Sequence, residues 1–157
     1  MRKAIFVKFI QVILAALILS SAIFYIVASS ALLKSSRKDM TYTLRAIDSV
    51  LDYSGDLEGE VMKLEETVND NSSRFTVIRK DGSVVADTGV VDTASMDNHL
   101  DREEVKEALE TGSGSSRRYS DTLKKNMLYV AYVSDHSDYI LRMAVPFTGF
   151  KEYLVLL

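Results

Sequence analysis

Hydrophobic residues fill the first part of the chain almost without interruption. The run from Phe9 to Leu33 contains no charged residue and is broken only by Gln11 and a few serines. A helix of these 25 residues is roughly 37 Å long, which exceeds the roughly 30 Å of a bilayer's hydrocarbon core. We therefore expect a transmembrane helix over residues 9–33, preceded by a short polar segment at 1–8.

A cleaved signal peptide is the competing interpretation of this run, because the small residues Ala28–Ser30 resemble a cleavage site. Cleavage at Ser30 would release a secreted soluble domain. The hydrophobic part of a signal peptide is usually about 7–15 residues long, so the length favours an uncleaved anchor. Charge counting does not fix the orientation, since three basic residues precede the run and three follow it: Arg2, Lys3, Lys8, Lys34, Arg37 and Lys38.

Beyond the membrane segment, apolar residues recur in steps of three and four, which predicts an amphipathic helix over Met40–Val68 within a segment at 34–72. A skip at Ser54 and the nearby Gly55 and Gly59 mark a place where this helix can break. The stripe would pack either on its own domain or on a twin helix, which would give a homodimer. Nine acidic residues between 39 and 70 predict a solvated polar face, with a divalent-cation site as a lesser alternative. The stripe consists of Met40, Leu44, Ile47, Leu51, Leu57, Val61, Leu64 and Val68.

After Ser73 the pattern alternates between apolar and polar residues, which is typical of strands. The Asp-Gly pair within 80–83 predicts a type I′ hairpin. Asp101 is the expected N-cap of a short helix that ends at Thr111–Gly114. The order predicts an α+β fold over 73–146: a PAS-like antiparallel five-stranded sheet with helices on one face. Its strands are expected at 74–79, 84–87, 116–121, 127–134 and 139–145.

Composition removes several classes of function. Residues 34–157 hold 16 basic and 22 acidic residues, a net charge of −6 that argues against a nucleic-acid partner. Cysteine is absent, so disulfides and thiolate chemistry are excluded. His99 and His136 have no paired spacing for a metal, and the chain contains neither a nucleophile elbow nor a phosphate-binding loop. We expect no enzymatic activity, cofactor or metal.

A family resemblance rests on residues from Asp81 to Ala131. In order and spacing they resemble the extracytoplasmic sensor region of bacterial phosphate-regulon-type sensor histidine kinases, whose domain is PAS-like or single-Cache. The matching residues are Asp81–Asp87, Met96–Arg102, Glu104, Gly114, Arg118–Ser120, Thr122, Leu123 and Met127–Ala131.

The resemblance implies a topology and an output. Residues 1–8 would be cytoplasmic, residues 34–150 would lie outside the bacterial cell membrane, and a second transmembrane helix would start within 147–157. The His-Glu-Leu-like helix and the ATP-binding boxes are missing, so a response regulator would be reached only through a kinase absent from this chain. The alternative is a membrane-tethered PAS-like module that docks a protein and has no kinase output.

Six polar residues are the candidates for binding a small-molecule or protein signal. Arg118 has a guanidinium that can hold a carboxylate or phosphate in a two-pronged contact. Strand alternation places Arg117 on the opposite face, so the two arginines do not share a ligand. The competing interpretation is structural: Arg118 pairs with Glu104 or Asp87, and the asparagine and histidine cap the helix and fix the loop. The candidates are Asn98, His99, Arg102, Arg118, Tyr119 and Ser120.

Overall fold

A computed structural model describes residues 2–68, 72–90, 92–120 and 124–147 of the chain. It divides the chain into two compact units, of which the second comprises Ser36–Thr148. The predicted start of a second membrane helix, at 147–157, lies outside the described residues from position 148 onward.

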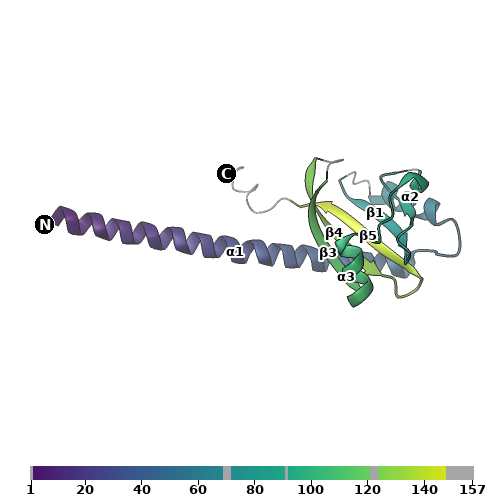
Figure 1. Ribbon diagram of the computed structural model, residues 1–157, viewed down its shortest axis with the longest axis horizontal. Coiled ribbons are helices and arrows are strands. Elements are labelled where there is room, and N and C mark those ends of the chain that lie inside the picture. The colour runs from purple at the N-terminus through teal and green to yellow at the C-terminus, as the bar shows by residue number, and fades with distance from the viewer. Residues whose placement is uncertain (1, 69–71, 91, 121–123, 148–157) are drawn as a thin grey trace. The chain divides into compact units, whose positions relative to one another are not determined.

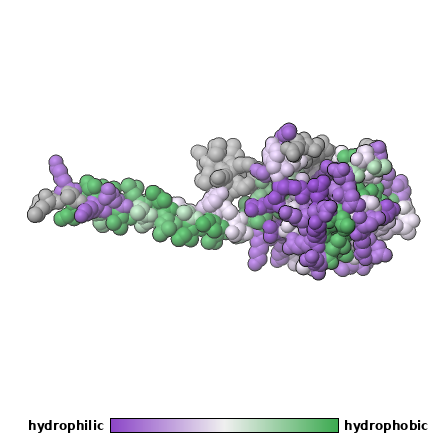
Figure 2. Space-filling model, viewed as in Figure 1, coloured by the Kyte–Doolittle hydropathy of each residue, from purple (hydrophilic) through white to green (hydrophobic). Residues whose placement is uncertain are grey.

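The first unit is the N-terminal part of helix α1, which runs from Arg2 to Val50. Hydrophobic side chains gather along it, as Figure 2 shows, and those from Ile5 to Val27 are exposed. By length and composition this helix can cross a membrane, and none of its most apolar window is buried in the protein. This agrees with the prediction of a membrane helix made from the sequence.

The predicted Met40–Val68 helix is interrupted at the place that the skip at Ser54 and the nearby Gly55 marked as a possible break. Helix α1 ends at Val50, and α2 covers Leu57–Val68. Between them, Asp52 Oδ1 accepts hydrogen bonds from the backbone N–H and the hydroxyl of Ser54, which holds a turn. Asp56 then accepts a bond from the N–H of Gly59 at 3.0 Å and caps α2. Side-chain hydrogen bonds to the backbone therefore replace the helical ones at this break.

The apolar stripe packs on its own domain. Five of its eight members are at most 9% exposed, and of these Leu44 and Val61 are fully buried within the chain. These five side chains are covered by the domain itself, and a homodimer through the Met40–Val68 segment stays a prediction. The buried members are Met40, Leu44, Leu51, Leu57 and Val61.

The second unit is built on one five-stranded antiparallel sheet, as predicted (Figure 1). The strands are ordered β2-β1-β5-β4-β3, so β5, the last strand of the described residues, lies at the centre. Strand β3 begins three residues earlier than expected, directly after Gly112 ends helix α3 in a left-handed conformation. The elements are β1 (Arg74–Arg79), β2 (Val84–Asp87), the 3-10 turn η1 (Thr93–Ser95), α3 (Glu103–Thr111), β3 (Ser113–Ser120), β4 (Lys125–Val133) and β5 (Tyr139–Pro146).

Helices cover both faces of the sheet, whereas the sequence predicted one face. On one side Val105 and Ala108 of α3 pack with Ile78 and Ile140. On the other side lies the last part of α1, where Asp48 accepts a hydrogen bond from Ser134 Oγ at 2.5 Å. Asp48 also accepts bonds from the Tyr53 hydroxyl and from the backbone N–H of Asp135. These bonds fasten α1 to the β4–β5 connection.

Two local predictions were wrong in detail. In the β1–β2 turn only Gly82 has a positive φ, 87°, so the turn is not type I′, which needs two such residues. Instead the Gly82 N–H donates a hydrogen bond to the Arg79 carbonyl and closes a turn, and Gly82 itself is the one left-handed residue. Helix α3 begins after Arg102, not after Asp101, whose carboxylate is exposed and pairs with Lys106.

Candidate functional site

Helix α3 covers only part of its sheet face, and the remainder is hollowed into a cavity of about 520 Å³. The segment that contains η1 and leads to α3 forms one wall of the cavity. Alternate side chains of the sheet strands form its floor. Arg142 and Ala144 of β5 point to this face because they are two residues apart, as do Met127 and Tyr129 of β4. The lining residues are Arg74, Ser95, Met96, Asp97, His99, Arg102, Arg118, Tyr119, Ser120, Met127, Tyr129, Arg142 and Ala144.

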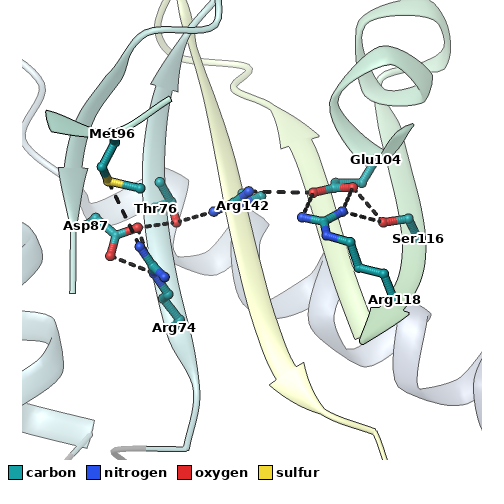
Figure 3. A network of polar contacts seen from close by, with 8 residues as sticks. All are labelled: Arg74, Thr76, Asp87, Met96, Glu104, Ser116, Arg118 and Arg142. Carbon is teal, nitrogen blue, oxygen red and sulfur yellow. Dashed lines mark hydrogen bonds and ion pairs between the residues drawn. The ribbon is translucent and has the colours of Figure 1, made fainter. Parts of the chain in front are cut away.

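A fully buried carboxylate, Glu104, organises one side of the cavity (Figure 3). It accepts two hydrogen bonds from the Arg118 guanidinium, at 2.8 and 3.2 Å, and one from Ser116 Oγ at 2.5 Å. Arg142 Nη1 lies 3.6 Å from its other oxygen. The second residue of α3 therefore fixes two arginines from two different strands.

A second buried carboxylate, Asp87, organises the opposite side. It accepts hydrogen bonds from Arg74 Nε at 2.7 Å and from Thr76 Oγ1 at 2.8 Å. Arg142 Nη2 donates to the same Thr76 hydroxyl at 3.2 Å. Figure 3 shows the result, a continuous row of polar contacts across the sheet from β2 to β3 with Arg142 in the middle.

Aromatic stacking and burial complete the electrostatics of the floor. The Arg118 guanidinium lies 3.7 Å from the centre of the Tyr129 ring, and that of Arg142 lies 5.6 Å from it. Burial lowers the pKa of Arg142 to about 10, although it stays charged at neutral pH. Burial alone would raise the pKa of Glu104, but hydrogen bonds from Arg118 and Ser116 outweigh it and hold this pKa below the usual value.

His99 lies at the back of the wall and is only 4% exposed. Its backbone N–H donates to the Gly82 carbonyl at 2.8 Å, while its ring atom Nδ1 has no hydrogen-bond partner. Burial, followed by the positive charges of Arg142 and Arg102, lowers the pKa of His99 to about 4. The imidazole is therefore neutral near pH 7, so it does not sense pH changes near neutrality.

Because His99 is neutral in the folded state near pH 7, we expect the folded chain to lose stability in acid. The unfolded imidazole takes up a proton below its ordinary pKa of about 6.5, whereas the folded one does so only near pH 4. Between pH 7 and pH 5 the wild-type chain should therefore lose about 1–2 kcal/mol more unfolding free energy than His99→Gln. Urea titrations of the full chain in detergent at both pH values measure this difference. His136→Gln, at an exposed histidine, is the control, and equal losses in wild type and His99→Gln would contradict the prediction.

Five of the six residues singled out in the sequence line the cavity: His99, Arg102, Arg118, Tyr119 and Ser120. Asn98 does not. Its Nδ2 donates to the Asp81 carbonyl and its Oδ1 accepts from the N–H of Leu100, so it fixes the β1–β2 turn. The structural interpretation of Arg118 also holds, since Arg118 pairs with Glu104. Arg117 lies on the other face of β3, where its guanidinium stacks on the Phe147 ring.

The sequence analysis missed Arg74 and Arg142 as cavity residues. A signal for Arg142 existed, because it is the one charge inside the otherwise apolar run from Ile140 to Val145. Among the residues that the structure describes, no group of three or more acidic or histidine side chains is placed to hold a metal ion.

No protein-family model matches the chain, and no curated protein matches its sequence. Solved structures do share its fold. The Bacillus subtilis YkuI protein, which has an EAL domain and was solved with c-di-GMP and calcium, gives a TM-score of 0.63 at 12% identity over 80% of this chain. The ligand-binding domain of a Pseudomonas aeruginosa amino acid chemoreceptor, in complex with GABA, gives 0.61 at 10% identity over 85%.

A third structure is the ligand-binding domain of a Campylobacter jejuni chemoreceptor in complex with 4-methylisoleucine, with a TM-score of 0.52 at 14% identity over 76% of this chain. The chain spans only 36%, 63% and 53% of these three proteins, in the order given. At such low identity the likeness concerns the fold alone. The chain thus has the fold found in the ligand-binding domains of two bacterial chemoreceptors.

Proposed function

We propose that this chain is the membrane-anchored, extracytoplasmic sensor module of a two-component histidine kinase of the phosphate-regulon type. The observation that carries the proposal is the 520 Å³ cavity, which lies on an open sheet face. It is lined by charged groups that buried carboxylates hold in place. Cavities of roughly 300–1,000 Å³ are the usual size of small-molecule sites. The fold shared with chemoreceptor domains and the exposed apolar helix support a sensor anchored in a membrane. The sequence resemblance supports the kinase output.

The connectivity of the second unit supplies a route for the signal. Strands β4 and β5 carry Tyr129 and Arg142 into the cavity, and the connection between the same strands holds Asp48 of α1. A ligand that binds one position of these strands better than another would therefore shift the last turns of α1. The size of the shift is limited by the difference in affinity between the two positions.

Filling the cavity tests this function. Ala144 is 2% exposed and lines the cavity, so Ala144→Trp should occupy the ligand's place. In the complete gene product, expressed in its own host, we expect histidine phosphorylation to become independent of the external medium. Ala94→Trp, on an exposed residue of η1 outside the cavity lining, is the matched control and should respond like wild type.

Two results would overturn the proposal. If the complete gene encodes no kinase after this region, the two-component output is wrong and a docking module takes its place. If the kinase is present and Ala144→Trp still follows the medium as wild type does, the cavity does not receive the signal.

A further inference from the structure

We infer that a second cavity, on the opposite face of the sheet, binds a small organic cation with an apolar body. This second cavity has a volume of about 180 Å³ and lies where helices α1 and α2 meet strands β1 and β5. Its ligand would hold an ammonium group beside Glu65 and would place its apolar body among four side chains: Ile47, Leu64, Phe75 and Met143. The inference goes beyond the proposed function, which concerns the 520 Å³ cavity.

Two paired strands supply the floor of the second cavity. Met143 stands between Arg142 and Ala144, which both line the 520 Å³ cavity, so strand alternation turns Met143 to the other face of the sheet. Phe75 is directly opposite Met143 in the pairing of β1 with β5. Side chains opposite each other in an antiparallel pair are neighbours on one face, so Phe75 and Met143 form a continuous apolar surface.

The two helices supply the walls, and each leaves an apolar side chain partly uncovered there. In α1, Leu44 is fully buried, whereas Ile47, one turn later, is only partly buried. In α2, Val61 is fully buried, whereas Leu64, again one turn later, is only partly buried. Ile47 and Leu64 both line the second cavity. Since an apolar cavity of roughly 150 Å³ can hold a benzene ring, this one is large enough for one aromatic ring or a short aliphatic chain.

Three polar residues of the lining already have their partners within the chain. The Phe75 N–H donates to Thr88 Oγ1, and the Thr88 N–H donates to the Phe75 carbonyl, each at 3.0 Å. Thr43 Oγ1 donates to a backbone carbonyl one turn earlier in α1. The Arg74 guanidinium is bound by Asp87 on the other face of the sheet. The part of a ligand that enters the cavity therefore needs no hydrogen-bonding group and gains from the removal of apolar area from water.

Glu65 sets the charge that the ligand should carry. Its side chain lines the second cavity and is partly buried, and no hydrogen bond or ion pair joins its carboxylate to any residue that the structure describes. Lys63, the lysine of α2, is paired with Glu60 at 2.6 Å. Helix α2 holds four glutamates and one lysine, so the potential around its wall is negative. An ammonium group would neutralise Glu65, whereas an anionic ligand would be repelled.

Methyl NMR of the full chain in detergent micelles, labelled with carbon-13 at the methionine methyl groups, tests this inference. Three probes carry the same ring and differ in charge: phenethylamine, phenethyl alcohol and phenylacetate. We expect phenethylamine to shift the Met143 resonance and to leave those of Met96 and Met127, which line the 520 Å³ cavity, in place. The neutral alcohol should bind about 2- to 5-fold more weakly, the usual effect of losing a partly exposed ion pair, and the anion more weakly still.

Two variants locate the ligand. Glu65→Gln should weaken phenethylamine binding about 2- to 5-fold, to the affinity of the alcohol. Glu66→Gln is the matched control, because Glu66 is the exposed neighbour on α2 and does not line the cavity, so it should bind like wild type. Leu64→Trp places a larger side chain in the second cavity and should abolish the Met143 shift. A Met127 resonance at its wild-type position shows that this variant is folded.

Three results would overturn the inference. If no probe moves the Met143 resonance, or if the shifts occur at Met96 and Met127 instead, the second cavity is not a binding site. If the alcohol or the anion binds as tightly as the amine, the ligand is not a cation. If Glu65→Gln and Glu66→Gln lose the same affinity, Glu65 has no specific part in binding.

Discussion

Glu104→Gln is expected to lower the unfolding free energy of the second unit by about 3–5 kcal/mol, the usual cost of removing one partner from a buried ion pair. Glu104 is fully buried, and its carboxylate is the counter-charge of Arg118 and the closest one to Arg142. A neutral amide of the same shape would leave the buried Arg142 guanidinium without its nearest negative charge and would remove the ion pair of the partly exposed Arg118. The amide also has only one oxygen to accept the bonds that Glu104 accepts from Arg118 and Ser116.

Urea unfolding of the full chain in detergent, followed by circular dichroism, measures this loss. Glu103→Gln is the control, because Glu103 is the exposed neighbour on the first turn of α3, and it should change stability by no more than about 0.5 kcal/mol. The pKa of Glu104 is held low in the folded state, so its contribution is complete above the ordinary pKa of a glutamate. It is lost as the pH falls through the lower folded value. Equal stability of the two variants at pH 7 would contradict the role given to this carboxylate.

Gly114→Ala should cost about 3 kcal/mol, at the upper end of what overpacking a core usually costs. A methyl group at this position of β3 would run into the carbonyl oxygen of Glu104 and would lie 2.7 Å from the backbone nitrogen of Ala108. Both obstacles are backbone atoms of α3, so no side-chain rotation relieves them. Helix and strand would have to separate, and the cavity wall that depends on them would move as well.

Thermal or urea unfolding of Gly114→Ala measures this loss, and Gly55→Ala is its matched control. At Gly55 the nearest atom would be Asp52 Oδ2 at 3.4 Å, an ordinary contact, so the change should stay within about 0.5 kcal/mol. A Gly114→Ala protein as stable as wild type would show that α3 and β3 are not held in the close contact described here.

The strands were predictable because their signals are local. Alternation over Arg74–Arg79 and Val84–Asp87 around an Asp-Gly pair gave both strands at their observed limits. For the helix break, the skip at Ser54 and the nearby Gly55 marked the place, but they did not establish that the helix ends there. The helix breaks because the side chains of Asp52 and Asp56 accept hydrogen bonds from nearby backbone N–H groups, in competition with the helical backbone bonds. Which set of bonds forms depends on tertiary packing, which the spacing of apolar residues does not reveal.

The candidate site was only partly predictable for a related reason. His99, Arg102 and Arg118 occur in recognisable polar segments, so the sequence alone suggested them. Arg74 and Arg142 join the cavity because β1 pairs with β5, where Thr76 is opposite Arg142. That register connects positions 66 residues apart, and no local pattern encodes it. The pairing of Glu104 with Arg118 was foreseen as one of two alternatives, and only the packing of α3 on β3 decides between them.

The central place of β5 has a consequence for how the protein is made. The hairpins β1–β2 and β3–β4 can form as soon as each is synthesised, but they pair with one another only through β5, the last of the described strands. Until residues 139–146 arrive, β1 and β4 each present an open edge, and such edges invite pairing with other chains. Joining strands so distant in sequence is also slow. A nascent or exported chain would therefore be most vulnerable to aggregation and proteolysis just before β5 emerges.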